Sequence, residues 1–488
     1  MAKILVRSHV KFGENHTPSE VLIRNLIGNN TGNYIFMRSV IRTLMVTDDT
    51  EIESIRFNRA RIPKEEIEYY NNECSAFIIP LANAFRVSFM KELNRITDLV
   101  EQLDIPCVVV GVGLQAPIDR DNYTFSFDED VKRFMNAVLQ KSSIVGIRGE
   151  ETGNYLKHLG YVEEKDFTVI GCPSMYTYGD SLPEIRLPEL TPSSKVSYNM
   201  KSELPTPLYQ FIRRESQRFE NAVFISQVVW EIHNLFIGYP NNKSKSPKFP
   251  ADYPAHFSDP FMKDSKMVGF LEQPSWVEFL SGMDFNFGSR IHGNIISLLA
   301  GTPCYILASD SRVAELASYH NIPHISYLDL KDDTTIFDLY EKADYSAFYK
   351  GHRKRVDHYL EIYDKNQIPH ISREMLNGKD TPFDRFVQGE KNFGVIRPFP
   401  ELTLEEQEAR MAEYSLTHIR RFDQYREMKN EEVNNKNLII SEKNALIRDQ
   451  NREIRSLKNE IEWMRSSKFW KMRDQFMKLR GKDEQFPR

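Results

Sequence analysis

The sequence predicts a mixed α/β protein with two doubly wound parallel α/β domains and a long helical arm. Two series of short apolar runs alternate with amphipathic helical patterns, and this strand-helix-strand rhythm is typical of parallel sheets. A proline-rich segment separates the two series. After residue 403, Glu, Lys, Arg and Asn dominate, and neither Gly nor Pro occurs before Gly481, which predicts one long exposed helix.

The first domain is expected over residues 1–180, where apolar runs and helical patterns alternate from the N-terminus onwards. The expected strands are 2–6, 74–80, 105–113, 142–149 and 166–174. The expected helices are 33–46, 88–103, 128–140 and 150–159. Gly160 follows the last of these helices and is typical of a C-terminal cap.

Residues 179–194 contain three prolines and no periodicity, as expected of a crossing between domains. A second domain is expected over 195–345, and a closing helix at 346–366 with a linker completes 346–402. The expected strands of the second domain are 195–200, 221–226, 284–288, 303–308 and 324–328. The Lys-, Pro- and Ser-rich stretch 241–260 predicts a long loop, either a lid or recognition segment or a plain insertion.

The arm, residues 403–488, carries a heptad pattern between 433 and 464. Its apolar residues at a and d positions are Val433, Ile440, Ile447, Ile454, Leu457, Ile461 and Met464. β-Branched a positions favour two parallel strands, so this seam predicts a homodimer. The early d positions are Lys436, Lys443 and Gln450, so docking of the helix on the body stays an alternative.

The end of the arm, residues 465–482, combines seven basic residues and one acid with several aromatic and apolar residues. Basic and aromatic side chains that share a helix favour contact with an anionic bilayer surface. The alternative is a solvated helix end whose rings pack on a partner arm.

Composition excludes several classes of protein. The formal charge is −5, from 64 Lys and Arg against 69 Asp and Glu, which argues against a nucleic-acid binder. No run of about 18 apolar residues occurs, and the first residues predict a strand rather than a signal peptide. We therefore expect a cytoplasmic protein, or one on the inner face of the cytoplasmic membrane. The four cysteines form no C-x-x-C pair, which argues against a zinc or dithiol site.

The strongest candidate for a binding site is the turn after residues 284–287. Gly288 and Ser289 precede a helix that begins near Arg290, and such a turn at the end of a parallel strand is where α/β proteins bind ligands. The start of the helix offers unpaired N–H groups to an anion, and Gly288 and Gly293 allow close backbone approach. Arg290 adds a two-bonded grip on a carboxylate or phosphate. His292 lies beside it, where an anion would raise the pKa of the imidazole and favour an acid role.

The stretch FGSRIHGNIISLLAGTP, followed by Asp310 and Glu315, resembles the signature of the polysaccharide pyruvyl transferase family. Three segments of the first half agree with it, namely GVGLQAP, GIRGEETGNYLKHLGY and VIGCPSM. The resemblance covers about residues 1–345. The arm lies outside it, and its SSKFWKMRDQF is similar to segments appended to bacterial glycosyltransferases of surface-polysaccharide pathways.

The resemblance implies two Rossmann-like domains that face a cleft, as in the GT-B glycosyltransferases. It also implies transfer of the pyruvyl group of phosphoenolpyruvate, without metal or cofactor, to a saccharide as a ketal in capsule or exopolysaccharide assembly. The acceptor would be lipid-linked or nucleotide-linked. Arg290 and His292 are the expected catalytic residues. The expected substrate-binding residues are Arg148, Gly288, Ser289, Gly293, Gly113, Gln115, Asn33, Asp310 and Glu315. The general base stays open among Asp310, Glu315 and Glu150.

Two departures from the family pattern lie in the first half. IIPLANAFR has Asn83 where a glycine-rich turn is usual, and Asn33 replaces the acid of an Asn-x-Gly-Asp motif. They keep two alternatives open: a GT-B glycosyltransferase that uses a sugar nucleotide, and a non-catalytic scaffold of a polysaccharide assembly complex.

Overall fold

The computed structural model describes residues 3–10, 12–57, 59, 62–118, 120, 122–238, 250, 252–254, 259–264 and 266–479. Residues 1–414 form one compact unit and residues 415–488 form a second. Most of the loop expected at 241–260, and residues 480–482 at the basic end of the arm, lie outside the described residues.

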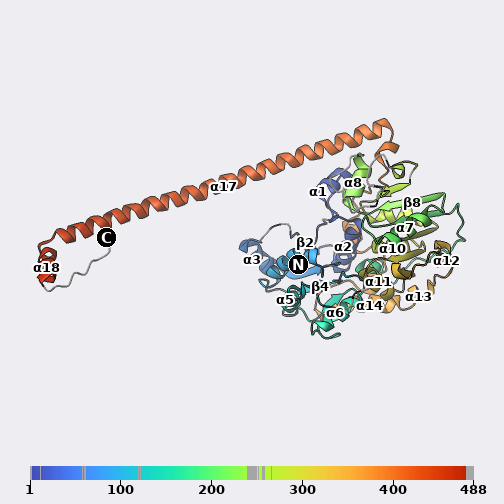
Figure 1. Cartoon of the computed structure of the whole chain (residues 1–488), viewed down its shortest axis with the longest axis horizontal. Coiled ribbons are helices and arrows are strands. Elements are labelled where there is room, and N and C mark those ends of the chain that lie inside the picture. Colours follow the sequence, from blue (N-terminus) through green and yellow to red (C-terminus); the bar gives the residue numbers. More distant parts are fainter. Residues whose placement is uncertain are drawn as a thin grey trace. The chain divides into compact units, whose positions relative to one another are not determined.

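The first sheet of the larger unit is parallel and has the strand order β2-β1-β3-β4. Its strands β2 and β4 are labelled in Figure 1. A parallel pair, β5-β6, continues it through a bridge between Val112 and Ile147. The strands are β1 Lys3–Arg7, β2 Glu51–Ile55, β3 Cys74–Pro80, β4 Cys107–Val110, β5 Val145–Ile147 and β6 Phe167–Val169. All were expected except β2, an edge strand whose sequence, EIESI, has no continuous apolar run.

The helices of the first half of this unit are α1 Pro18–Arg24, α2 Thr31–Leu44, α3 Lys64–Glu73, α4 Met90–Val100, α5 Asp128–Leu139 and α6 Glu150–His158. Helix α2 begins two residues earlier than expected because Asn30 caps it: the backbone N–H of Gly32 donates to Asn30 Oδ1 at 2.7 Å. Helices α1 and α3 were not expected.

The second sheet is also parallel, with the order β12-β11-β10-β7-β8-β9. Its strands are β7 Lys195–Asn199, β8 Asn221–Ser226, β9 Met267–Gly269, β10 Phe285–Gly288, β11 Cys304–Ala308 and β12 His324–Ser326. The sequence missed only β9, which has three residues. The chain runs outwards from β7 to one edge and from β10 to the other, so the strand order reverses between these two neighbours.

The helices of the second half follow the expected rhythm, with one interruption. They are α7 Thr206–Ser216, α8 Val229–Ile237, α9 Gln273–Ser281, α10 Ile291–Leu299, α11 Ser311–Tyr319, α12 Ile336–Glu341, α13 Ser346–Tyr349, α14 His352–Lys365, α15 Arg373–Leu376 and α16 Pro382–Phe386. The single helix expected at 346–366 is divided into α13 and α14, because Gly351 adopts a positive φ of 81° between them.

The predicted fold class is confirmed: both sheets are parallel, helices alternate with their strands, and a long helix follows. One continuous apolar core contains residues from both sheets, for example Ile78, Val110 and Phe287. Both sheets belong to one compact unit, residues 1–414. The domain boundary expected between residues 180 and 195 stays a prediction.

The second unit consists of the distal part of α17 (Leu404–Ser466, 63 residues) and α18 (Lys468–Leu479). The chain breaks helical regularity at Ser467, whose hydroxyl accepts from the backbone N–H of Trp470 at 3.3 Å. The apolar heptad residues of α17 are 46–55% exposed. The dimer expected through 433–464 stays a prediction. Among the described helices, none combines the length and apolarity needed to cross a bilayer.

Candidate functional site

The carboxyl ends of β7 and β10 lie side by side where the strand order reverses, and they form the centre of the site. Gly288 ends β10 opposite Asn199, which ends β7. A Cβ at Gly288, where φ is 150°, would lie 2.0 Å from the Asn199 carbonyl oxygen, so only glycine permits this approach. The backbone N–H groups of Ser289 and Arg290 donate to the Asn199 carbonyl and to its Oδ1, at 3.1 and 2.7 Å. Asn199 thus holds the predicted turn in place.

Arg290 lies at the N-cap of α10 with its side chain 13% exposed. Its Nε donates to the Met200 carbonyl at 2.8 Å, and its Nη2 lies 3.5 Å from Glu231 Oε1. Glu231 is fully buried and also accepts from the hydroxyls of Ser226, at 2.7 Å, and Tyr253. The Arg290 side chain also lies within hydrogen-bonding reach of the Tyr253 hydroxyl. These contacts hold the guanidinium at the start of α10, beside the carboxyl ends of β7 and β10.

Arg148 is the most unusual group of the site because it is fully buried and has no ion-pair partner within the part of the chain that the structure describes. Its exposed fraction is 0%, and its Nε donates to the Gly111 carbonyl at 3.1 Å. Within the described part of the chain, neither Nη1 nor Nη2 has a hydrogen-bond partner. Gly113 leaves room for the side chain, since a Cβ there would lie 3.0 Å from Arg148 Cδ. Burial lowers the pKa of this guanidinium. An unpaired buried charge is strongly unfavourable, so this arrangement indicates an anion site.

His292 joins the second sheet's helix α10 to the first half of the unit. Its ring lies against the start of α2, where a Cβ at Gly32 would be 2.3 Å from His292 Nδ1. Its Nε2 lies 3.8 Å from Cys172 Sγ. Burial, together with Arg148 and Arg312, lowers the pKa of His292 to about 3, so without a ligand the imidazole is neutral at pH 7. The increase in pKa expected from a bound anion would begin from this low value.

Two buried carboxamides that the sequence reasoning missed lie over the first turn of α10. A Cβ at Gly293 would lie 2.4 Å from Gln227 Nε2 and 2.9 Å from Asn199 Nδ2. Both residues are 1% exposed, and neither amide nitrogen has an acceptor among the described residues. With Arg148 they form a set of buried donors without acceptors, which an anion would satisfy. Asn199 and Gln227 could have been found from the sequence, because each is a polar residue at the end of a predicted buried strand.

Asp310 caps helix α11 and pairs with Lys201. Its Oδ1 accepts from the backbone N–H of Val313 at 3.0 Å, and its Oδ2 accepts from Lys201 Nζ at 2.6 Å. Burial acts to raise the pKa of Asp310, but Arg312 and Lys201 outweigh burial and lower the pKa below its ordinary value. Burial also lowers the pKa of Lys201 to about 8. These contacts suit Asp310 to positioning the two cations rather than to accepting a proton.

Glu315 links α11 to the first turn of α6. It is 5% exposed and accepts from Thr152, from the backbone N–H at 2.9 Å and from Oγ1 at 3.0 Å. A Cβ at Gly149 would lie 2.8 Å from the Glu315 side chain. Burial raises the pKa of Glu315 to about 7, so this carboxyl can exchange a proton near neutrality. Glu150, the other carboxyl considered, is exposed.

The remaining predicted residues have local partners. Gln115 Oε1 accepts from Asn83 Nδ2 at 2.7 Å and from Arg86 Nη1 at 3.1 Å, so Gln115 joins Asn83, which lies where a glycine-rich turn was usual, to a cation. Asn33 Nδ2 donates to the Gly28 carbonyl at 2.6 Å, within the turn before α2. No group of three or more His, Cys, Asp or Glu side chains that could hold a metal is found among the described residues.

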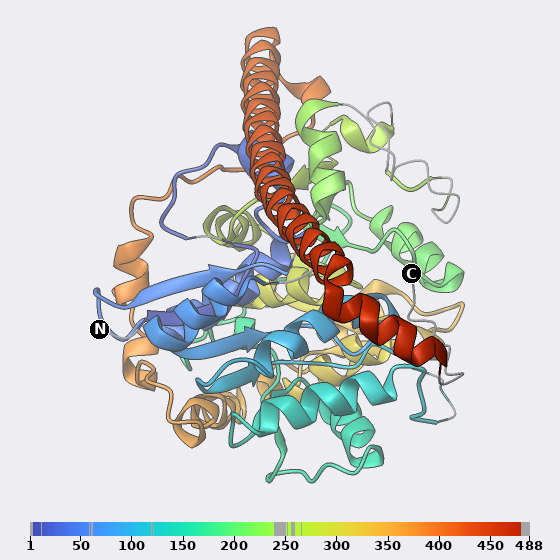
Figure 2. The same ribbon diagram turned by 90° about the vertical axis from the view of Figure 1, so that its left-hand side faces the viewer.

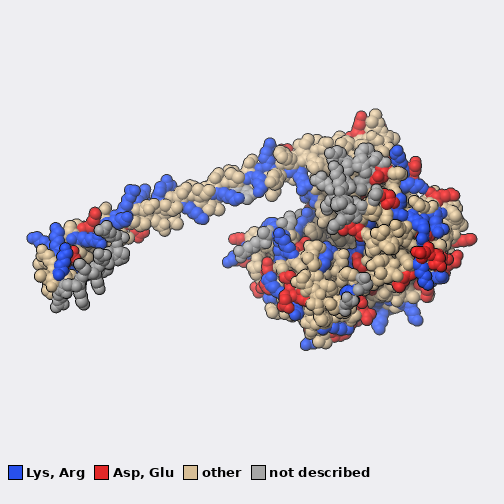
Figure 3. Space-filling view, in the orientation of Figure 1, with Lys and Arg blue, Asp and Glu red and all other residues tan. Residues whose placement is uncertain are grey.

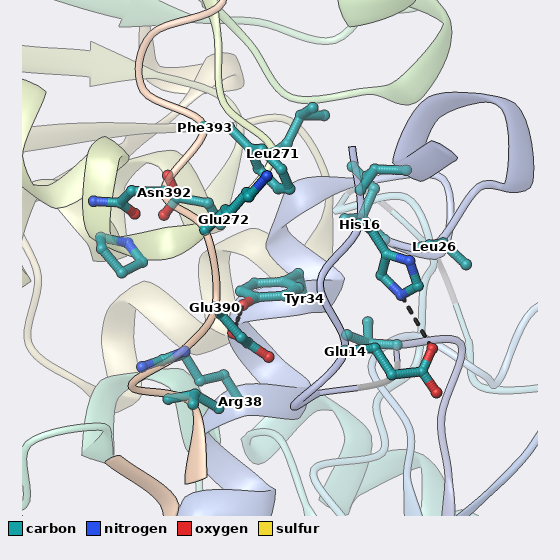
Figure 4. A pocket seen from close by; sticks show the side chains of 16 residues that line it. Glu14, His16, Leu26, Tyr34, Arg38, Leu271, Glu272, Glu390, Asn392 and Phe393 are labelled. Atoms are coloured by element: carbon teal, nitrogen blue, oxygen red, sulfur yellow. Dashed lines mark hydrogen bonds and ion pairs between the residues drawn. The ribbon is translucent and has the colours of Figure 1, made fainter. Parts of the chain in front are cut away.

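A second pocket, separate from the site around Arg148 and His292, is lined by the face of α2 that points away from His292 (Figure 4). Tyr34 and Arg38 of α2 line it together with His16, Glu272 and Glu390. At 100° per residue, Tyr34 lies about 200° around the helix from Gly32, the residue that contacts His292. Phe36, by contrast, lies on the Gly32 side, and the Arg148 guanidinium lies over its ring, 5.6 Å from the centroid. The pocket of Figure 4 is therefore distinct from the site around Arg148 and His292.

Residues 30–311 match the family described as polysaccharide pyruvyl transferase, which is more than half of the chain. The chain belongs to the polysaccharide pyruvyl transferase family. The matched region contains Arg148, Arg290 and His292, and the resemblance in the sequence is confirmed. The protein is thus, by family, a pyruvyl transferase acting on polysaccharide. A search of curated proteins found no match.

The solved structures found by comparison have low sequence identity and TM-scores below 0.5. S. aureus MnaA with UDP is 10% identical with a TM-score of 0.38, over 81% of this chain and 100% of that chain. The UDP-GlcNAc 2-epimerase of Methanocaldococcus jannaschii, in complex with UDP-GlcNAc and UDP, is 12% identical with a TM-score of 0.37, over 80% and 99%. The glycosyltransferase SnogD from Streptomyces nogalater is 11% identical with a TM-score of 0.27, over 74% and 95%.

Proposed function

We propose that this pyruvyl transferase takes its pyruvyl group from phosphoenolpyruvate and joins it to two hydroxyls of one saccharide as a cyclic ketal. The observation that carries the proposal is Arg148, whose two terminal nitrogens are buried without an acceptor among the described residues. A buried guanidinium with this geometry suits a two-bonded anion such as a carboxylate or phosphate.

Phosphoenolpyruvate carries both of these anions on a small frame, so it needs two sets of donors close together. Arg148 supplies one set, and the start of α10 with Arg290 supplies another. The amide nitrogens of Asn199 and Gln227 add neutral donors at the first turn of α10. Arg312 adds positive charge to the same region, since its charge lowers the pKa of Arg148 and of His292.

The reaction balances without an additional reactant. A proton adds to the methylene carbon of phosphoenolpyruvate, and the first sugar oxygen bonds to the central carbon. The bond from that carbon to the phosphate oxygen then breaks, and the second sugar oxygen takes its place. The two hydroxyls lose two protons, of which one equals the proton gained by the new methyl group and the other leaves on phosphate. The enzyme therefore has to stabilise negative charge and move protons.

His292 is the proposed carrier of a proton in this sequence. It is neutral before the donor binds, and a phosphate beside it stabilises the imidazolium that forms when a sugar hydroxyl is deprotonated. The imidazolium can then protonate the departing phosphate. Of the carboxyls considered as a second proton-transfer group, Glu315 fits better than Asp310, because its pKa of about 7 is close to neutrality.

The test is acceptor-dependent release of phosphate from phosphoenolpyruvate by the purified protein, with lipid-linked and nucleotide-linked saccharides of capsule and exopolysaccharide pathways. His292→Ala and the double variant Arg290→Ala, Glu231→Gln should fold and lose turnover. The double change removes both members of the buried pair, so that no charge is left unpaired. Arg353→Ala is the matched control, because the Arg353 side chain is 70% exposed and lies far along the chain on α14.

Two outcomes would favour the alternatives. Thermal stabilisation by a sugar nucleotide, without stabilisation by phosphoenolpyruvate, would indicate a glycosyltransferase. Loss of function in cells after deletion of the arm, without any turnover of the intact protein in vitro, would indicate a scaffold.

A further inference from the structure

Helix α18 presents an apolar face in the second unit of the chain. Phe469, Met472 and Leu479 are 75%, 65% and 86% exposed. At 100° per residue these three side chains lie within an arc of about 80° on the helix. Trp463, at the end of α17, is 74% exposed as well. Large apolar side chains this exposed on one face mark an interaction surface.

The rest of α18 is basic. Lys471 and Lys478 lie on the side of the helix opposite Phe469, Lys468 lies at the boundary of the apolar arc, and Asp474 is the only acid in the helix. Arg473 lies over the ring of Trp470, with its guanidinium carbon 4.8 Å from the ring centroid. Figure 3 shows Lys and Arg side chains gathered at this end of the chain. The helix thus combines an apolar face with a cationic one.

We propose that α18 lies in the interfacial layer of an anionic lipid bilayer, with Phe469, Met472 and Leu479 among the acyl chains and the lysines near the headgroups. An amphipathic helix with aromatic residues on one face and lysines on the other is what this layer selects. Burial of the apolar face removes from water the surface that the folded chain leaves exposed, and the lysines gain from the negative surface potential.

A second copy of the chain is the competing occupant, and charge argues against it. The heptad seam that would pair two chains lies in α17, and helical regularity is interrupted at Ser467, before α18. Figure 2 shows the bend at this end of the long helix. A second copy could cover the apolar face, but it would leave Lys471 and Lys478 on the opposite side of the helix without the negative charge that anionic headgroups supply. A dimer through α17 would instead place two α18 helices at the same end, where both could contact one bilayer.

The proposal is tested by flotation of the full-length protein with vesicles of phosphatidylcholine alone and of phosphatidylcholine with phosphatidylglycerol. Binding to the anionic vesicles is expected, and it should fall as salt is raised from 0.05 to 0.5 M because surface charges are screened. Each lysine near an anionic surface should change the partition coefficient by about fivefold, so that Lys468→Gln, Lys471→Gln, Lys478→Gln together reduce it by about a hundredfold.

The matched control is Lys443→Gln, Arg455→Gln, Lys458→Gln, which removes three charges from exposed positions of α17 and should leave binding unchanged. A second variant, Phe469→Ser, Met472→Ser, Leu479→Ser, should reduce binding at every salt concentration while circular dichroism stays the same. Equal binding to both kinds of vesicle, an equal effect of the control, or loss of self-association instead of vesicle binding in the α18 variants would overturn the proposal. Acceptor-dependent phosphate release with a soluble acceptor is expected to be the same in all these variants, so the test is independent of the proposed reaction.

Discussion

Replacement of Arg148 by methionine should stabilise the ligand-free protein and abolish donor binding. Arg148 is fully buried, makes one hydrogen bond through Nε, and leaves two terminal nitrogens without an acceptor among the described residues. Replacement of buried charged groups by apolar residues of similar volume is often neutral or stabilising, by about 1–4 kcal/mol. We therefore expect the free energy of unfolding without ligand to stay the same or to increase within that range.

Donor binding should change in the opposite direction. If each terminal nitrogen of Arg148 donates to an anion, the variant loses two charge-assisted hydrogen bonds of about 1.5–3 kcal/mol each. Their sum of about 3–6 kcal/mol corresponds to a Kd for phosphoenolpyruvate that rises by at least about a hundredfold. Arg148→Lys keeps the positive charge but cannot donate two parallel hydrogen bonds, so its Kd for phosphoenolpyruvate should lie between that of the unchanged protein and that of Arg148→Met.

Chemical denaturation and isothermal titration with phosphoenolpyruvate measure the two effects separately. Opposite changes in stability and affinity are expected of a residue that is strained until its ligand arrives. A variant that is much less stable without ligand would show that Arg148 is a structural residue. An unchanged affinity would show that its nitrogens do not contact the donor.

Three further predictions concern the junction of the two halves, the pH dependence and the arm. Gly32→Ala should displace the His292 ring, since the new Cβ would lie 2.3 Å from Nδ1, and it should lower kcat while Gly389→Ala, whose Cβ meets nothing within 4 Å, leaves kcat unchanged; equal rates would mean that His292 does not need this position. Burial raises the pKa of Glu315 from 4.5 to about 7, so the stability that its protonated form contributes is present below pH 4.5 and is lost as pH rises to about 7, by about 3 kcal/mol. Denaturation of Glu315→Gln at several pH values should not show this loss. A difference in stability between the variant and the unchanged protein that stays constant with pH would contradict the prediction. Sedimentation should show a dimer that Ile447→Asp with Ile454→Asp converts to a monomer, whereas Asn444→Asp with Asn451→Asp does not. A monomer in every case would contradict the predicted dimer.

The sequence correctly predicted the elements that contain a continuous apolar run or a recognisable turn. Strands such as β3 and β11 are continuous buried runs, and the Gly288–Ser289 turn before α10 follows from residue type and spacing. Strand β2 was missed because an edge strand with two glutamates has neither an apolar run nor a clear helical pattern.

The pKa values and the buried donors of the site could not be predicted from local sequence patterns. A bound anion was expected to raise the pKa of His292, but the low pKa from which that rise begins comes from burial of the ring against Gly32, more than 250 residues earlier in the chain. Asn199 and Gln227 follow strands that are ordinary in sequence, and only the order of the sheet places them beside α10. Such contacts arise from topology, which local patterns do not encode.

The most direct test of the central claim is a carbon NMR measurement with phosphoenolpyruvate labelled at its central carbon, incubated with the protein and a saccharide acceptor. We predict that the vinyl carbon signal is replaced by that of a quaternary carbon attached to the saccharide through two oxygens, with one phosphate released for each. Conversion of the label to free pyruvate only, at the same rate with and without acceptor, would contradict the account.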